Sequence, residues 1–295
     1  MTPSQSSRVS VVIPHYNHGE FIELTLQSIC SQTVPCSELI VVDDGSDDAR
    51  SRDALRQLSA RPRVRVIYQD HRHVAAARNT GIRAARCPHI FVMDSDDLVE
   101  PTFLEECLAV LDRRPSVGIV SSWLRTFGVG EWLVKPQGGD VRNFLHKNNC
   151  PGQAVFRRAC WEQAGGYKEE LRNDSEDWEF YLSVLELGWH AHIVEKPLIR
   201  YRLRQVSANS EAQTRRPELY KRIVELHAET YHRYLTETLC RKEQQAVEKY
   251  AVIRDMMLRH GDLELPEVTF GDGGMAFRTA VECARASTRS QSQHP

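Results

Sequence analysis

Strand-like and helix-like patterns alternate over roughly the first 120 residues of the chain. Short apolar runs are typical of strands buried in a sheet, and they occur at Val9–Ile13, Leu39–Val42, Val64–Tyr68, Ile90–Met93 and Val117–Ser121. The segments between them predict helices at about 20–31, 47–60, 74–86 and 101–113. This alternation predicts an α/β fold with a central, mostly parallel sheet flanked by helices.

The pattern is less regular after residue 121. Residues 122–155 are rich in glycine, include Pro136 and Pro151, and are expected to form loops over one face of the sheet. Beyond them the spacing predicts a helix ending at Gly165–Gly166, a helix at about 175–187, and two extended segments near 191–195 and 198–202.

The C-terminal part of the chain is rich in helix formers and charge. From Pro217 to about residue 260, apolar residues repeat at helical spacing and predict an amphipathic extension. It could pack on the main domain, a partner subunit or a membrane surface, and packing on the main domain is the commonest outcome. We divide the chain into a main domain over 1–209 (halves about 8–121 and 122–209), a helical extension over 210–285 and a disordered tail over 286–295.

Composition narrows the class of protein without identifying it. The 295 residues are 41% hydrophobic and 26% charged, which is ordinary for a soluble globular protein. The net charge of −2 gives no support for binding to nucleic acid. We find no apolar run of ~18 residues that could span a membrane and no signal peptide at the N-terminus. The eight cysteines include no Cys-x-x-Cys pair, so we expect no zinc site and a cytoplasmic location.

An acidic cluster, Asp94-Ser-Asp-Asp97, directly follows the predicted strand Ile90–Met93. Side chains alternate along an extended chain, so Asp94 and Asp96 would point the same way. Two adjacent acids repel unless a cation lies between them, and oxygen ligands together with substrate phosphates are typical of Mg²⁺ or Mn²⁺ sites. A polar turn before the next helix would explain one acid but not three.

Polar residues also follow the first two predicted strands, at 14–17 and 43–47. Ligands of open α/β sheets bind at the carboxyl ends of the strands, so these groups and the acidic cluster would converge if the strands are neighbours. Helix capping explains Ser46 and Asp47 but leaves Asp43 and Asp44 unexplained. The pairs His71-x-His73 and His190-x-His192 have no obvious third metal ligand, and we interpret them as incidental.

Two predicted helices carry charged residues next to apolar faces. Arg78 shares a face with Val74, Ala77, Gly81, Ile82 and Ala85 and needs an anionic partner, which could be a phosphate or an internal carboxylate. Asp177 borders the apolar face of Trp178, Tyr181, Leu182 and Leu185, whereas Glu176, Glu179 and Ser183 are expected on the polar side. Acids in a first helical turn can simply be dipole partners, so spacing alone leaves the role of Asp177 open.

Together these segments resemble the glycosyltransferase family 2 proteins, which have the GT-A fold. The resemblance covers about residues 8–209, and its motifs occur in family order at 9–17, 41–48, 76–82, 93–97, 156–158, 165–167, 176–178 and 201–202. It implies an inverting transferase that moves one sugar from a nucleotide-diphospho-sugar, typically a UDP-sugar, to an acceptor hydroxyl.

The resemblance also implies a role for each matching residue. It implies nucleotide contacts from Pro14, Tyr16, Asn17, Asp43, Asp44, Arg78 and Asp94, a Mn²⁺ or Mg²⁺ ion held by Asp96, Asp94 and Asp97, and a general base, Asp177, supported by Glu176. The chain departs from many relatives at His73, where they have glycine, and at Arg204, where they have histidine. Arg204 cannot ligate a cation but could bind the diphosphate directly, so we expect weaker metal dependence.

The acceptor and the biological setting stay open at this stage. A glycan, a lipid-linked saccharide, a peptide or a small molecule could be the acceptor, and Trp123 and Trp132 lie where relatives shape that site. The family favours surface-glycan assembly. The Gln-x-x-Arg-Trp motif of processive synthases is absent from this sequence, so we expect one sugar to be added per encounter. Peripheral membrane contact and a homo-oligomer through the C-terminal helices are further expectations. The alternatives are a sugar-1-phosphate nucleotidyltransferase, which usually has a glycine-rich loop after the first strand, and a binding module that has lost catalysis.

Overall fold

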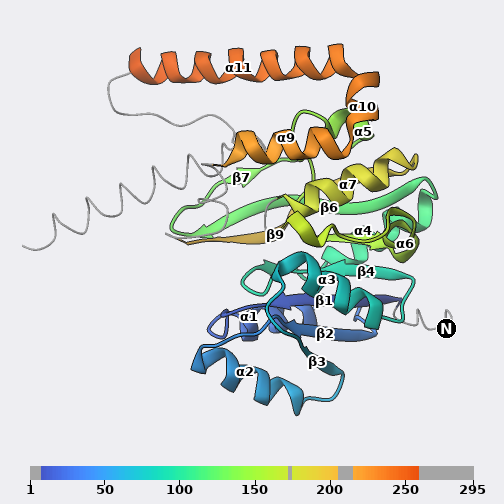
Figure 1. The fold of residues 1–295 in the computed structure, drawn as a ribbon. Coiled ribbons are helices and arrows are strands. Elements are labelled where there is room, and N and C mark those ends of the chain that lie inside the picture. Colours follow the sequence, from blue (N-terminus) through green and yellow to red (C-terminus); the bar gives the residue numbers. More distant parts are fainter. Residues whose placement is uncertain (1–7, 172–174, 205–214, 259–295) are drawn as a thin grey trace, which may run out of the picture.

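The computed structural model describes residues 8–171, 175–204 and 215–258 (Figure 1). The tail predicted over 286–295, and the parts of the main domain and the extension predicted over 205–214 and 259–285, lie outside this part of the chain. The described residues form one nine-stranded mixed sheet and helices on both of its faces, which confirms the predicted α/β class.

Most strands of the sheet run in one direction. Strands β3 (Val64–Tyr68), β2 (Glu38–Asp43), β1 (Val9–His15) and β4 (His89–Val92) run parallel in that spatial order. Beyond β4 the order continues with β8 (Ala154–Arg157), β6 (Val117–Gly128), β9 (His190–Leu203) and β5 (Leu98–Val99), with β7 (Leu133–Val134) paired to β6. Strand β8 is antiparallel to both β4 and β6, so β6 runs in the same direction as β4, and β9 is parallel to β6. Strands β5 and β7 are also antiparallel to their neighbours, so the sheet is mixed but mostly parallel, as predicted.

Each face of the sheet has its own hydrophobic core. The first core packs around α1 (Ile22–Cys30), α2 (Ala49–Ser59) and α4 (Phe103–Arg113), and the second around α3 (His73–Ala84), α6 (Arg158–Ala164) and α7 (Glu176–Glu186). In β1, Val11 and Ile13 belong to the first core and Val12 to the second. Strands covered on both faces therefore need continuous apolar runs, which is why those runs predicted them.

Residues 122–155 contain regular structure where loops were expected. Strand β6 continues to Gly128, and β7, α5 (Val141–Phe144) and β8 follow. Polar side chains in the buried part of β6, such as Ser121, Ser122 and Thr126, interrupt the apolar pattern that would have predicted the strand. Similarly, β9 is one long strand, whose pairing with β6 shifts register where Trp123 lies opposite Pro197.

The first two C-terminal helices pack on the main domain, which was the commonest outcome expected. Helices α9 (Arg216–Leu226), α10 (Ala228–Arg233) and α11 (Leu235–Leu258) follow β9 along the chain, and α9 lies beside α7 (Figure 1). The hydroxyls of Tyr220 and Tyr231 both donate to the carbonyl of Leu145, just after α5. Within the described residues, none of the helices has both the length and the apolar character needed to cross a bilayer.

The close approach of α3 to the sheet depends on a glycine. A Cβ at Gly81 would lie 2.4 Å from Val12 Cγ1 and 3.1 Å from Val42 Cγ2. Both valines are fully buried, so they have little room to move away. The small-residue face predicted for this helix is therefore the face that packs against β1 and β2.

We expect Gly81→Ala to destabilise the protein. Overpacking of a buried contact costs about 1–3 kcal/mol, which exceeds the gain of roughly 0.5–1 kcal/mol from replacing a helical glycine. Urea unfolding would measure the loss, with Thr80→Ala on the same helix as a control without the steric conflict. Equal unfolding midpoints for the two variants would contradict this account.

Candidate active site

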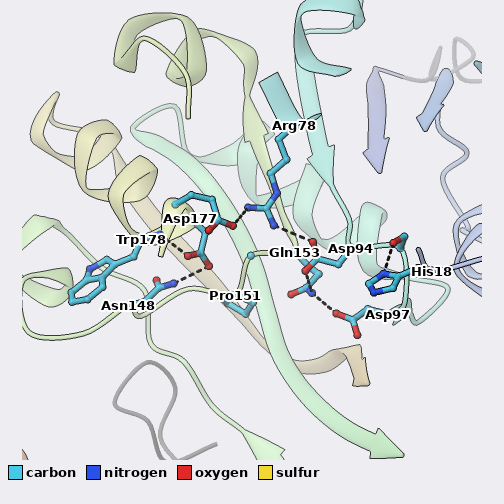
Figure 2. Close-up of polar contacts among 12 residues, drawn as sticks. His18, Arg78, Asp94, Asp97, Asn148, Pro151, Gln153, Asp177 and Trp178 are labelled. Carbon is cyan, nitrogen blue, oxygen red and sulfur yellow. Dashed lines mark hydrogen bonds and ion pairs between the residues drawn. The ribbon is translucent and has the colours of Figure 1, made fainter. Parts of the chain in front are cut away.

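The predicted site residues converge at one edge of the sheet. Strands β2, β1 and β4 are neighbours, and their carboxyl ends present Asp43–Asp44, Tyr16–Asn17 and Asp94–Asp97 respectively. The expected convergence of these three groups of residues is thus confirmed. Asp177 and Glu176 in the first turn of α7 and Arg204 after β9 complete it. Figure 2 shows Asp177, Arg78, Asp94 and Asp97 together.

The two acids at the end of β2 are held by local hydrogen bonds. Asp43 Oδ1 accepts from the Ser46 backbone N–H at 3.3 Å. Asp44 Oδ1 accepts from Gln69 Nε2 at 2.6 Å and from the Arg72 backbone N–H at 2.9 Å. These bonds give both buried acids the structural explanation that capping did not supply, and a nucleotide contact from either stays a prediction.

Aromatic residues lie beside Asp44. His71 Nδ1 is 2.8 Å from Asp44 Oδ2, and its ring stacks on Tyr16 with centroids 4.2 Å apart. His71 thus packs between Asp44 and Tyr16, contacts that the interpretation of the His71-x-His73 pair did not address. His73, where many relatives have glycine, has a left-handed backbone (φ 68°), a conformation that glycine adopts without strain.

Pro14 and Asn17, the other two residues predicted from the motif at 9–17, shape the backbone at the end of β1. Pro14 lies within β1 opposite Val42 of β2. Asn17 has a left-handed backbone (φ 53°), and its side chain donates to Asp47 Oδ1 at 2.8 Å and accepts from the Asp47 N–H at 3.1 Å. Asn17 thereby ties the loop after β1 to the loop after β2.

Arg78 is buried between two carboxylates from distant parts of the chain. Its Nη1 donates to Glu176 Oε1 at 2.6 Å and its Nη2 to Asp94 Oδ1 at 3.0 Å, with only 4% of the side chain exposed. Burial opposes the charge, but Glu176 and Asp94 outweigh it and raise the pKa of the guanidinium well above its ordinary value. The sequence left two kinds of anionic partner open for Arg78, a phosphate or an internal carboxylate. In the structure the partners are internal carboxylates.

The acidic cluster after β4 is bridged by a glutamine. Gln153 Nε2 donates to Asp94 Oδ2 at 2.9 Å and also to Asp97 Oδ2, as Figure 2 shows. The other Asp97 oxygen accepts from the Arg202 N–H at 2.7 Å. Burial and the neighbouring Asp96 and Asp94 charges raise the pKa of Asp97 well above its usual value.

Asp96 has a cationic partner. Its Oδ2 lies 3.2 Å from Arg204 Nη2, with 13% of the Asp96 side chain exposed. Burial raises the pKa of Asp96 to about 6, in spite of the opposing charge of Arg204. Each of the three acids is thus paired within the protein by Arg78, Gln153, the Arg202 backbone or Arg204.

Asp177 lies next to this cluster but has neutral hydrogen-bond donors. Its Oδ2 accepts from Asn148 Nδ2 at 3.0 Å and its Oδ1 from the Trp178 N–H at 2.7 Å. Burial and the adjacent Glu176 raise the pKa of Asp177 to about 7, while Arg78 opposes the shift. A Cβ at Gly152 would lie 3.4 Å from Asp177 Oδ2 and 4.0 Å from Asp94 Oδ2, so the two acids face one small space.

The expected polar side of α7 is not exposed to solvent. Glu176 and Glu179 are 7% and 1% exposed, so the side predicted to be polar is buried against other polar groups. Arg78 covers Glu176 from one side. On the other, His227 at the start of α10 lies with Nδ1 3.0 Å from Glu186 Oε1 and Nε2 3.8 Å from Glu179 Oε1. Helices far along the chain therefore change the environment of this face.

Three residues of the site carried no signal in the sequence. Gln153 and Asn148 come from the irregular segment before β8, and no spacing links them to Asp94 or Asp177. His18, after β1, has Nδ1 2.8 Å from Ser95 Oγ and Nε2 3.0 Å from Arg204 Nη2. In the sequence, only the polar run that begins at Pro14 could have indicated a role for His18.

The curled mixed sheet with this acidic edge defines the class of nucleotide-sugar transferase folds termed GT-A. Among solved structures, Staphylococcus aureus TarS in complex with UDP-GlcNAc has the same fold, with a TM-score of 0.60 and 18% identity over 74% of this chain and 65% of that chain. The family described as Glycosyl transferase family 2 matches residues 10–165. The chain belongs to glycosyl transferase family 2.

Curated relatives differ in how much of their length this chain covers. It is 30% identical to Bacillus subtilis TuaG, a protein assigned to teichuronic acid biosynthesis, over 74% of this chain and 89% of that protein. It is 29% identical to the Escherichia coli chondroitin synthase over 63% of this chain but only 27% of the synthase. The chain thus spans about a quarter of that larger relative.

Members of this family generally use a divalent metal ion. Asp94 and Asp97 have both oxygens engaged by protein donors, and Asp96 faces Arg204. Across the residues that the structure describes, no three His, Cys, Asp or Glu side chains are grouped so as to hold a metal ion. The carboxylates as they lie do not fit the ion expected at Asp94, Asp96 and Asp97, because arginines and Gln153 take its place as their partners.

We expect Arg78→Met to destabilise the protein by about 3–5 kcal/mol, because it leaves two carboxylates without their buried partner. Arg83→Met on the same helix is the control: Arg83 is 57% exposed and lies 3.5 Å from Glu169, an ion pair of a kind worth about 0–1 kcal/mol. Urea unfolding at neutral pH measures both. Similar losses in the two variants would show that the buried pairing is not needed for stability.

Proposed function

We propose that the protein is a non-processive, inverting glycosyltransferase that moves one sugar from a nucleotide-diphospho-sugar to an acceptor hydroxyl. The observation that carries this proposal is the pairing of unlike acids around Gly152. Asp94 is tied to a cation, whereas Asp177, within reach of the same space, has neutral donors and a pKa of about 7. Neighbouring carboxylates in different environments are suited to different roles in one reaction.

Asp177 is proposed as the general base. In the reaction, the acceptor oxygen forms a bond to the anomeric carbon while the bond from that carbon to the diphosphate oxygen breaks. Asp177 accepts the acceptor's proton, and the nucleoside diphosphate leaves with the bonding electron pair. Asn148 and the Trp178 N–H hold the carboxylate in place. Glu176 supports Asp177 indirectly, because it takes the Nη1 hydrogen bond of Arg78.

The donor is proposed to lie between the ends of β1, β2 and β4. The stacked rings of Tyr16 and His71 beside Asp44 offer an apolar surface and a carboxylate, which suits a nucleobase such as uracil. UDP and UDP-GlcNAc are the ligands named for the TarS structures, which support a UDP-sugar here. Pro14, Asn17 and Asp43 would act by shaping the loops around the base.

The acceptor site is proposed on the side of β6, β7 and α5. Trp132 is buried in the first core, which favours a packing role over acceptor stacking. Trp123 is partly buried, with Lys135 Nζ 5.1 Å from its ring centroid, so it is the better candidate. The relatives support a place in surface-glycan assembly. The same proposal includes a GT-A domain over 1–209 and a cytoplasmic location. It also includes peripheral membrane contact or self-association through the C-terminal helices.

Asp177→Asn is the test of the proposed base. We expect it to lower turnover by about 10²–10⁴-fold, because general base catalysis contributes that much, and to leave binding of the donor's nucleoside diphosphate within a few-fold. A panel of nucleotide-sugars identifies the donor, and product release with acceptor mixtures reports turnover. Glu170→Gln removes the same charge from an exposed neighbour and should have no effect. Turnover unchanged in Asp177→Asn would exclude this residue as the base.

The pH dependence of the wild-type enzyme should follow the protonation of Asp177. Only the carboxylate can accept a proton, so we expect kcat/KM to rise about tenfold per pH unit below pH 7 and to level off above it. Initial rates between pH 5.5 and pH 9, with saturation of the donor checked at each pH, measure this profile. A flat profile below pH 7 would contradict the assignment.

A further inference from the structure

A guanidinium lies against the acidic cluster at the position where the family resemblance implies a metal-binding histidine. Arg204 Nη2 is 3.2 Å from Asp96 Oδ2, and 33% of the Arg204 side chain is exposed. Its Cζ lies 5.7 Å from the centroid of the Phe21 ring. The side chain is therefore anchored at the cluster while part of it faces the open site.

His18 positions Arg204 through a hydrogen bond that requires a neutral imidazole. A guanidinium can only donate, so His18 Nε2, 3.0 Å from Arg204 Nη2, must be the unprotonated nitrogen. The other nitrogen, Nδ1, then donates to Ser95 Oγ at 2.8 Å. Burial and the charge of Arg204 lower the pKa of His18 to about 4, which keeps it neutral at physiological pH. Ser95 is the middle residue of Asp94-Ser-Asp96, so the chain of contacts begins and ends within the cluster.

The neighbouring Arg202 fixes the rest of the strand end. Its backbone N–H donates to Asp97 Oδ1, and its Nε donates to the Asp96 carbonyl at 2.8 Å. Its Cζ lies 4.4 Å from the Phe127 ring centroid and 4.5 Å from that of Phe21. With both Arg202 and Arg204 built into the cluster, a divalent ion at Asp96 would meet strong repulsion from like charge.

We propose that Arg204, positioned by His18 and Asp96, binds the donor diphosphate in place of a divalent metal ion, so that donor binding requires no metal. The proposal rests on the proposed function, since it assigns the charge partner of the same donor. A guanidinium presents paired donors that match phosphate oxygens and stays charged at every physiological pH. It can stabilise the leaving diphosphate as a fixed positive charge.

Calorimetric titration of the full chain with UDP, GDP and dTDP tests whether nucleotide binding requires a metal ion. Each titration is done once in a buffer with EDTA and once in a buffer with Mn²⁺. We expect the preferred nucleotide to bind wild-type protein with a Kd that differs by less than about threefold between the two buffers. Arg204→His should lose about 10–100-fold of its affinity in EDTA, the worth of one or two charge-assisted hydrogen bonds, and regain much of it with Mn²⁺. Arg204→Lys should keep metal-free binding at reduced affinity.

Controls separate this proposal from protein stability and from the proposed function. Arg200→His makes the same change at an exposed residue of β9, the strand that precedes Arg204, and should bind like wild type. Circular dichroism confirms folding of each variant. Wild-type binding only in Mn²⁺, or unchanged metal-free binding by Arg204→His, would overturn the role of Arg204 and leave the proposed function standing. No binding of any of the nucleotides in either buffer would overturn the proposed function itself.

Discussion

The buried charge of Arg78 constrains the arrangement of the site more than any other interaction. A guanidinium with 4% of its side chain exposed is stable only if anions surround it. Its two partners belong to different halves of the main domain: Asp94 follows β4, and Glu176 begins α7. The ion pairs thus bring the acidic cluster and the first turn of α7 together. Gly81, one helical turn further along α3, allows the backbone approach that this requires.

The same distribution of charge gives neighbouring acids different properties. Glu176 takes one arm of Arg78, and Asp94 takes the other. Asp177 is left with the amide of Asn148 and a backbone N–H, which are neutral donors. Burial without a directly bonded cation raises the pKa of Asp177. A carboxyl group whose pKa is about 7 can exchange protons with a substrate hydroxyl. One arginine therefore separates an acid suited to proton transfer from acids that are committed to ion pairs.

The C-terminal helices complete the environment of α7. Tyr220 and Tyr231 bond to the Leu145 carbonyl, and His227 lies between Glu179 and Glu186. The segment that they hold leads directly to Asn148 and Gln153, which bond to Asp177 and to the acidic cluster. This packing is why Glu179 is buried although its spacing along the helix places it on a polar side. Amphipathic spacing describes one helix and carries no information about later helices that cover its other face.

Local patterns predicted the elements whose environment repeats along the chain. Strands β1, β2 and β4 are buried on both faces, β3 is a short apolar run at the sheet edge, and the helices between them have regular spacing, so their presence and order along the chain followed directly. The small-residue face of α3 likewise followed from Val74, Ala77 and Gly81. Strands β6 and β9 were predicted only in part, as Val117–Ser121 and as two short segments near 191–195 and 198–202, because buried serines and threonines, a proline and register shifts interrupt their patterns. Their stability comes from pairing with strands that are distant in sequence.

The chain by itself determined the fold class, the family and the residues that gather at the ends of β1, β2 and β4, because the order of elements and the motifs after each strand are local properties. Only the tertiary structure decided which charges meet. It paired Arg78 with Glu176, set Arg204 on Asp96 through His18, and brought Gln153 between Asp94 and Asp97. Ion pairs and hydrogen bonds act over a few ångströms in space, and no spacing along the chain encodes contacts between residues up to 186 positions apart.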